Sequence, residues 1–265
     1  MAFASALLQG NLGLFYGFIV AFIASYIVLA GGSFVFLYII KPRSLSRLKV
    51  KTEMPSRQEI FHEIRWSAIA LCVWAFMAVI LIYLVGHGAT KMYFDISAYG
   101  IGYFIFSILF LIVSHDAYFY WTHRLMHSST LMYNHVHTLH HKSTNPTPFA
   151  IFSFSPLEAV ILGAYVYLVV LVMPIHIYAL FVLFVFDTVI NMMGHLGYEV
   201  VPQSVSGSRF GRIFNTTVHH ALHHSGGRSN YGSYFSFWDL SMKTSNPDNE
   251  KVWAELHKRA QESRT

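Results

Sequence analysis

The architecture of the chain follows from residues 96–141, which read ISAYGIGYFIFSILFLIVSHDAYFYWTHRLMHSSTLMYNHVHTLHH. The first part, Ile96 to Ser114, carries no charged side chain and is long enough to cross the hydrocarbon core of a bilayer. The part after it, residues 115–141, holds seven histidines. The pattern predicts a helix that spans the membrane and continues beyond it into a region rich in imidazole groups.

Three other stretches of the chain have the same apolar character. Leu12 to Ile40 lacks the basic start of a cleavable signal and is too long for one, so we expect an anchoring span. Ser67 to Gly86 is a second span. Ala159 to Phe186 contains Pro174 near its middle and is too short for two full spans. This last stretch predicts either two short helices or a hairpin that enters the membrane and returns.

The composition fits a membrane protein. Of the 265 residues, 54% are hydrophobic and 12% are charged, and the mean hydropathy is +0.45. Soluble domains carry about 25% charged residues, so the composition excludes a soluble enzyme, a disordered chain and a nucleic-acid-binding domain. Cys72 is the single cysteine, which excludes an intrachain disulfide. We expect an all-α, multi-pass integral membrane protein in which residues 1–265 form one domain.

Basic residues concentrate between the first two spans, which is typical of the cytoplasmic side of a membrane. Counting spans from this connection places the N-terminus and the loop around His87 outside. Thirteen of the 16 histidines lie within residues 115–155 and 187–265, which the same count places together on the cytoplasmic side, and all of these except His257 are clustered. The basic connection contains Lys41, Arg43, Arg47, Lys49, Lys51, Arg57 and Arg65, against only Glu53, Glu59 and Glu63.

Three short motifs repeat histidine at helical spacing. Residues three or four apart share one face of a helix, so each motif aims its imidazoles at one point. Together the motifs offer eight histidines, and because one transition metal takes about four to six ligands we expect two ions. Imidazole accepts iron, zinc, copper or nickel, so the ligand type alone leaves the ion open. The motifs are His123-x3-His127, His137-x2-His140-His141 and His220-x2-His223-His224.

Capping residues bound the helices that carry these motifs. The first motif continues the helix of the third span. The second helix is predicted to start near Ser128 or Ser129. The third is predicted to be capped by Asn215 or Thr216 and to end at Gly226-Gly227. The predicted result is a helical, histidine-rich cap on the cytoplasmic side that holds a dinuclear metal site.

Residues outside the motifs extend the predicted site. His195 has Asn191 four residues before it on the same helical face, so we expect His195 to complete the metal site. Asn191 is either its weaker partner or an amide that bonds a helix neighbour. Asp116 lies two helical turns before His123, and its carboxylate can accept the free N–H of a metal-bound histidine. The other histidines are expected to be surface or supporting residues: His62, His87, His115, His135, His176, His219 and His257.

The motifs and their flanks resemble the fatty acid hydroxylase superfamily, which includes sterol desaturases. The resemblance covers roughly residues 100–245, so that residues 1–98 are additional N-terminal spans. Two positions depart from the family pattern: Asn191 stands where some members have histidine, and Met242-Lys243-Thr244 replaces a Gly-Thr ending. The matching flanks are Asp116-x3-Tyr120-Trp121, Pro156-x-Glu158, Asn230-Tyr231-Gly232 and Trp238-Asp239.

The resemblance implies a membrane oxidoreductase with a non-haem di-iron centre and O2 as co-substrate. It implies hydroxylation or desaturation of a sterol, fatty acyl or related lipid taken from the bilayer. Electrons would come from an external donor, such as cytochrome b5 or a ferredoxin with its reductase. Zinc can replace iron in purified protein because it competes well for imidazole. The membrane is the plasma membrane or the endoplasmic reticulum, depending on the organism.

Other metal-dependent classes fit the sequence less well. An intramembrane zinc protease needs His-Glu-x-x-His, but the only His-Glu pair, His62-Glu63, has no second histidine after it. A haem carrier needs facing histidine pairs rather than groups of three. A metal-binding or metal-transport protein of the membrane is the alternative, although transporters place their ligands within the spans. The motifs do not select the lipid.

Overall fold

The computed structural model describes residues 11–43, 45–202 and 213–262. Within these ranges every named secondary-structure element is a helix. β-Pairing is limited to isolated bridges, such as that between Lys49 and Tyr198. The all-α prediction is confirmed for the described residues.

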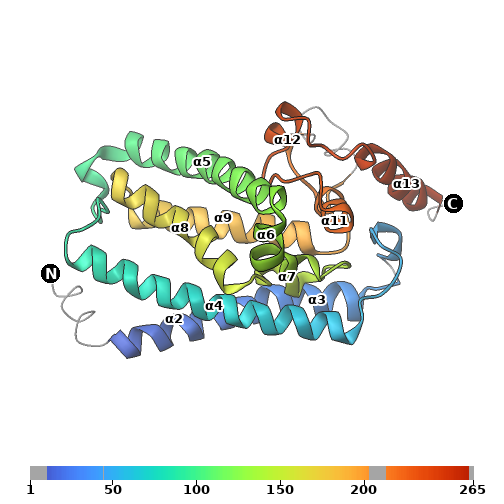
Figure 1. The fold of residues 1–265 in the computed structure, drawn as a ribbon, viewed down its shortest axis with the longest axis horizontal. Helices are drawn as coiled ribbons and strands as arrows, with labels where there is room; N and C mark the ends of the chain where they lie inside the picture. The colour runs from blue at the N-terminus through green and yellow to red at the C-terminus, as the bar shows by residue number, and fades with distance from the viewer. Residues whose placement is uncertain (1–10, 44, 203–212, 263–265) are drawn as a thin grey trace.

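Long helices run side by side along the molecule (Figure 1). The N-terminal helix consists of α2 (Asn11–Tyr26), η1 (Ile27–Gly31), α3 (Gly32–Phe34) and η2 (Val35–Ile40). It packs against α4 (Arg57–Gly86), which in turn contacts α8. The helix α5 (Gly100–Ser128) lies on the other side of the bundle and packs against α8 and α9.

Within the described residues, four helices are long and apolar enough to cross a membrane: Gly13–Ile40, Arg57–Gly86, Gly100–Ser128 and Ile177–His195. Many of their large apolar side chains, such as Val28, Phe76 and Ile105, point away from the bundle. A lipid environment removes the cost of exposing such side chains to water. The helices therefore support an integral membrane protein, as the composition predicts.

The region around Pro174 forms two helices, one of the two forms that the sequence predicts. They are α8 (Pro156–Val172) and α9 (Ile177–His195), and together they extend beyond both ends of the apolar stretch 159–186. Ser155 caps α8 by accepting a hydrogen bond from Glu158 N at 3.1 Å, and α9 continues past Asp187. Of the two helices, Ile177–His195 is long and apolar enough to cross a membrane, whereas Pro156–Val172 is shorter.

Short elements gather at one end of the long helices, on the right of Figure 1. The short helix α11 packs against both α9 and α13. This gathering forms the predicted helical cap. Its members are η3 (Ser46–Leu48), α6 (Thr130–Met132), η5 (Tyr133–His137), α7 (Thr138–His141), η6 (Pro148–Phe152), α11 (Thr217–Gly226), α12 (Phe237–Ser241) and α13 (Asn249–Glu262).

The sidedness of the cap is a testable prediction. Ser97, in η4 (Ile96–Ala98) between α4 and α5, and Ser225, in α11, are both exposed. Single cysteines at these positions, in a Cys72→Ser background, should react differently with a membrane-impermeant label on intact cells. We expect Ser97→Cys to be labelled and Ser225→Cys to be protected, because the basic connection holds the cap in the cytoplasm. Equal labelling of both from outside would exclude this topology.

Candidate metal centre

The helix boundaries that position the histidine motifs agree with the sequence. The first motif continues α5 without interruption. Ser129 caps the next helix by accepting a hydrogen bond from Met132 N at 3.4 Å. Thr216 precedes α11, and its N–H is held by Nδ1 of His219 at 3.3 Å. Gly227 ends α11 with a φ of 64°, a left-handed conformation that glycine adopts without strain.

Nine histidines converge from these elements into two clusters, within each of which the possible ligand atoms all lie within 4.8 Å of one another. Adjacent histidines point into different clusters, because neighbouring residues on a helix face different directions. The first cluster contains His123, His127, His137, His141 and His223, and the second contains His140, His195, His220 and His224. These are the nine residues that the sequence predicts as ligands.

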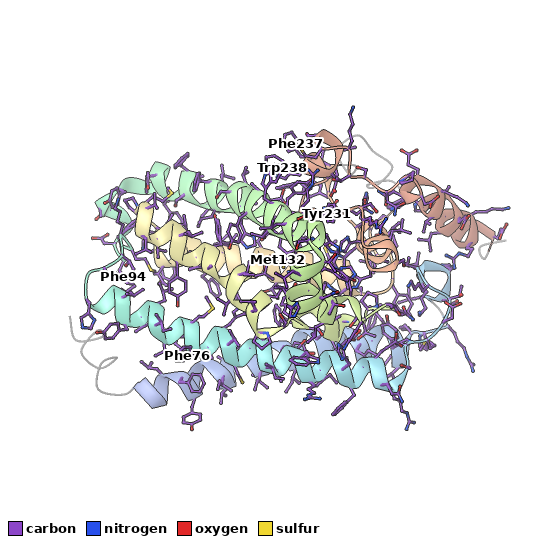
Figure 2. All side chains as sticks on the ribbon, in the orientation of Figure 1. Phe76, Phe94, Met132, Tyr231, Phe237 and Trp238 are labelled. Carbon is purple, nitrogen blue, oxygen red and sulfur yellow. The ribbon has the colours of Figure 1, made fainter. Side chains whose placement is uncertain are left out.

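Most of the clustered rings are held through Nδ1 by an acceptor outside the cluster. In the first cluster, Nδ1 of His123 lies 2.8 Å from the carbonyl oxygen of Tyr231, and Nδ1 of His223 lies 2.7 Å from that of Ser229. Figure 2 shows Tyr231 beside the nitrogen-rich region next to α11. In the second cluster, Nδ1 of His195 lies 2.8 Å from the carbonyl oxygen of Asn191.

A carbonyl oxygen has no proton to give, so Nδ1 of each of these rings must carry the hydrogen. Nε2 is then an unprotonated lone pair that points into the cluster. The second cluster repeats this arrangement at His140, whose Nδ1 lies 3.2 Å from the carbonyl oxygen of Ser153. The acceptors thus select the tautomer that binds metal.

The Nε2 atoms approach one another closely enough to share a cation. Nε2 of His123 lies 3.0 Å from that of His137, and Nε2 of His223 lies 3.0 Å from that of His141. Two lone pairs at that distance repel when no proton lies between them. Two imidazole nitrogens bound to one ion at about 2.1 Å and at right angles lie about 3.0 Å apart. The donor set therefore fits a metal ion in each cluster.

Burial favours the uncharged form of the clustered imidazoles. The pKa values of His140, His220 and His224 are held well below the usual histidine value, first by burial and then by repulsion from neighbouring histidines. Burial lowers the pKa of His223 to about 3. These rings are neutral near pH 7, and neutral imidazole is the form that binds metal.

Glu158 is a residue of the centre to which the sequence assigned no role. Its Oε1 accepts a hydrogen bond from Nδ1 of His137 at 2.7 Å, and its side chain is 1% exposed. Carboxylates that hold a metal-binding histidine in this way orient its ring and raise its basicity. Glu158 appeared in the sequence only within the family flank Pro156-x-Glu158. A glutamate in the first turn of an otherwise apolar helix was the signal that could have identified it.

Among the described residues, Asp116 bonds no imidazole, whereas Asn191 supports His195 through its backbone rather than through its side chain. The Asp116 carboxylate accepts hydrogen bonds from the backbone N–H groups of Tyr234 and Phe235, at 2.8 and 3.2 Å, so it holds the segment after Tyr231 rather than an imidazole. Asn191 contributes its carbonyl oxygen to His195, and its side chain faces a cavity.

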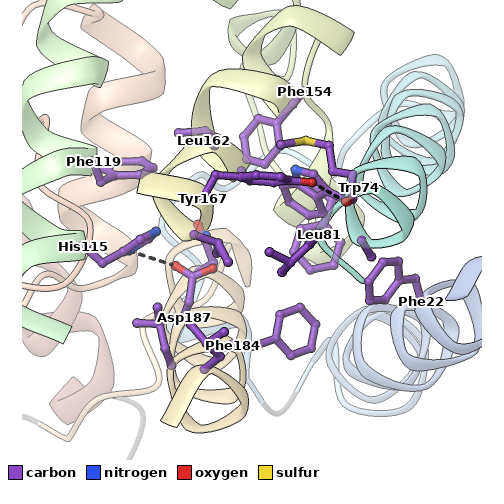
Figure 3. Close-up of a pocket in the computed structure, with 18 residues that line it drawn as sticks. Phe22, Trp74, Leu81, His115, Phe119, Phe154, Leu162, Tyr167, Phe184 and Asp187 are labelled. Carbon is purple, nitrogen blue, oxygen red and sulfur yellow. Dashed lines mark hydrogen bonds and ion pairs between the residues drawn. The ribbon is translucent and has the colours of Figure 1, made fainter. Parts of the chain in front are cut away.

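An apolar cavity of about 210 Å³ adjoins both clusters (Figure 3). Its walls come from α2, α4, α5, α8, α9 and the segment around η6. Phe119 lies against His123 of the first cluster, with ring centroids 5.2 Å apart, and Phe154 lies against His140 of the second, at 5.1 Å. A smaller cavity shares Phe119 and Asn191 with it and reaches His220. Phe119 and Phe154 thus line the large cavity and each also contacts a histidine of one cluster, so a single aromatic ring lies between that cavity and each cluster.

The chain matches known proteins over the part that carries the centre. The model of the family described as fatty acid hydroxylase matches residues 108–244. Lathosterol oxidase of Rattus norvegicus is 31% identical over 185 residues, which are 69% of this chain and 60% of that protein. A Delta(7)-sterol 5(6)-desaturase of Gibberella zeae is 31% identical over 152 residues, 57% of this chain and 45% of that protein.

The chain thus spans about half of the length of these curated relatives. A Delta(7)-sterol 5(6)-desaturase of Leptosphaeria maculans shows the same limit, with 30% identity over 203 residues that make up 54% of that protein. No solved structure matches the chain.

Proposed function

The chain belongs to the fatty acid hydroxylase family, and from that premise we propose that it hydroxylates or desaturates a lipid with O2. The observation that supports this most strongly is a pair of histidine clusters one aromatic ring away from an apolar cavity between membrane helices. A cavity of this character takes an apolar substrate, and its position places that substrate near the metal ligands.

We assign the two clusters as ligands of two iron ions, with zinc as a replacement in purified protein. When bound, a pair of iron ions supplies the oxidising power that protein side chains lack, using O2 and two electrons from outside. The protein holds the imidazoles neutral and aims their Nε2 atoms inward. Glu158 fixes the ring of His137, and the backbone acceptors fix His123, His140, His195 and His223.

The cavity walls keep water from the reacting carbon and hold the lipid beside the clusters. Phe22 of α2 and Trp74 of α4 line this cavity together with residues of α5, α8 and α9. The N-terminal helices therefore complete the binding space of the family-matched part, which supports the proposal that residues 1–265 act as one domain. Relatives are named as sterol enzymes, so a sterol is the first lipid to test.

The electron donor is proposed to reach the cap from the cytoplasm. A site at the end of the spans receives its lipid from the bilayer and its electrons from a soluble or membrane-bound carrier. Cytochrome b5, or a ferredoxin with its reductase, is the class of donor expected. The plasma membrane and the endoplasmic reticulum both meet these requirements.

The proposed function predicts that lipid conversion depends on O2. Membranes that contain the protein, supplied with NADPH and a reductase system, should convert a lipid that membranes with the His223→Ala variant leave unchanged. Comparing the lipids of the two membranes by mass spectrometry identifies the substrate. Removing O2 should stop the conversion, because the oxidising equivalents come from O2. Conversion at an unchanged rate under strict anaerobic conditions would refute the proposal, and metal transport without lipid conversion would favour the alternative class.

A further inference from the structure

Part of the wall of the apolar cavity is polar and is formed by His115 of α5 and Asp187 of α9 (Figure 3); Asn191 also lines the cavity, one turn further along α9. Nδ1 of His115 lies 4.0 Å from Oδ1 of Asp187. Tyr234, from the cap, bridges them: its hydroxyl lies 2.7 Å from His115 Nδ1 and 2.8 Å from Asp187 Oδ1. Ionisable residues within a span are costly, and where they occur they usually face a functional cavity.

The positions of the hydrogens in this bridge determine whether the wall presents hydrogen-bond donors or acceptors to a ligand. A tyrosine hydroxyl has one hydrogen, which Tyr234 donates to the carboxylate of Asp187. The contact with His115 is then a hydrogen bond only if Nδ1 of His115 carries a proton and donates it to the Tyr234 oxygen. Nε2 of the neutral ring is left as an acceptor.

Two acceptors of the wall have no hydrogen-bond partner among the residues that the structure describes: Nε2 of His115 and Oδ2 of Asp187. Both side chains line the cavity, and they are 14% and 23% exposed, respectively. Polar atoms in apolar surroundings cost free energy unless a donor reaches them. The wall therefore favours a ligand with a hydrogen-bond donor and disfavours a carboxylate or phosphate, which would bring acceptors and negative charge.

We propose that the cavity binds a lipid alcohol, whose hydroxyl group donates a hydrogen bond to the His115–Asp187 wall. This inference rests on the proposed function and names the substrate class of the same site. A carboxylic acid has the wrong charge for this wall, and an ether has no donor. Asp187 and His115 are thus the residues that determine specificity.

The wall lies away from the histidine clusters along both helices. His115 precedes His123, and Asp187 precedes His195, by eight residues each, which is about 12 Å of helix. Phe119 and Asn191 occupy the turns between. The hydroxyl group is therefore an anchor that sets which part of the apolar body faces the clusters, and it is not the group that reacts.

A binding experiment tests the inference without metal or turnover. Trp74 lines the cavity, so a brominated ligand bound there should quench its fluorescence. The probes are a dibrominated long-chain alcohol, its methyl ether and the corresponding carboxylic acid, titrated against the purified full chain. We expect the alcohol to bind about tenfold or more tightly than the ether or the acid, which is the scale of one hydrogen bond to a charged group. Trp74→Phe should lose the quenching.

The matched variant is Asp187→Asn, which keeps the shape of the side chain. It replaces one carboxylate oxygen, an acceptor, by an amide NH2 group, a donor. It should reduce the preference for the alcohol over the ether to within about threefold. Asp95→Asn, in the connection between α4 and α5, should keep the wild-type preference. Equal binding of alcohol and ether to the wild-type protein overturns the inference, and so does tighter binding of the acid. The wild-type comparison decides the matter even if Asp187→Asn does not fold.

Turnover is measured separately, so that the two proposals fail in different ways. Preferential binding of the alcohol without any O2-dependent lipid conversion would refute the proposed function and leave the specificity of the cavity standing. Conversion of a lipid without a hydroxyl group at the rate of the matching alcohol would refute the inference and leave the proposed function standing.

Discussion

Replacing His140 or His223 by alanine is expected to reduce lipid turnover by at least about 100-fold, since even changes outside the ligand set cost about 10–100-fold. The two residues belong to different clusters. Each substitution leaves one cluster with too few nitrogen atoms to hold a metal ion. Without the ion, the lone pairs of the remaining Nε2 atoms repel one another. The measurement is the rate of lipid conversion in membranes that contain equal amounts of each variant.

The control is His87→Ala. His87 is exposed and directly follows the C-terminal end of α4, and its ring bonds only the carbonyl oxygen of Tyr83 among the described residues. Its loss should leave turnover unchanged. A variant at His87 that is as inactive as His223→Ala, or a fully active His140→Ala, would show that the clusters are not the catalytic centre.

Glu158→Ala is expected to weaken metal binding by about 10–100-fold. The change removes the acceptor of His137 Nδ1, so that the ring loses both its orientation and the neighbouring carboxylate. Glu158→Gln should fall nearer the lower end of that range, because its amide oxygen can still accept the hydrogen bond. Competition with a chelator of known affinity measures the dissociation constant of each variant.

Glu63→Ala separates this effect from a general loss of stability. Glu63 of α4 is also fully buried, and its carboxylate bonds Thr147 and no histidine among the described residues. Its removal should lower the temperature of unfolding while leaving metal affinity unchanged. If Glu63→Ala weakens metal binding as much as Glu158→Ala does, the role assigned to the Glu158 carboxylate is wrong.

The nine histidines that converge in the structure could be predicted from the sequence because their signal is local. Spacings of three and four place histidines on one face of a helix, and the caps at Ser129, Thr216 and Gly227 bound those helices where the sequence indicates. His195 was identified from the same spacing, because Asn191 lies four residues before it in α9. Each of these inferences needs only one helix at a time.

The division of the ligands between two clusters could not be predicted in the same way. His140 and His141 are neighbours in the sequence, yet the first joins His195 and the second joins His223. Which histidines meet depends on how α5, α7, α9 and α11 pack together, and spacing within one helix carries no information on that packing.

The remaining features depend on contacts between residues far apart in the chain. Glu158 meets His137 across 21 positions, and Tyr234 meets His115 across 119. Asp187 follows the apolar stretch 159–186 in the sequence, and in the structure it lines the cavity within the continuing helix α9. A single charged residue in an apolar helix is thus a better indicator of a cavity than of a helix end.

The number of metal ions per chain tests the central claim most directly. Protein purified after growth with added iron, and analysed by elemental mass spectrometry against its protein concentration, should contain about two ions per chain, iron or zinc. His140→Ala and His223→Ala should each lose at least one ion, because each change breaks a different cluster. A wild-type protein that binds no metal, or variants that both retain the full wild-type content, would contradict the assignment of the two clusters as a metal centre.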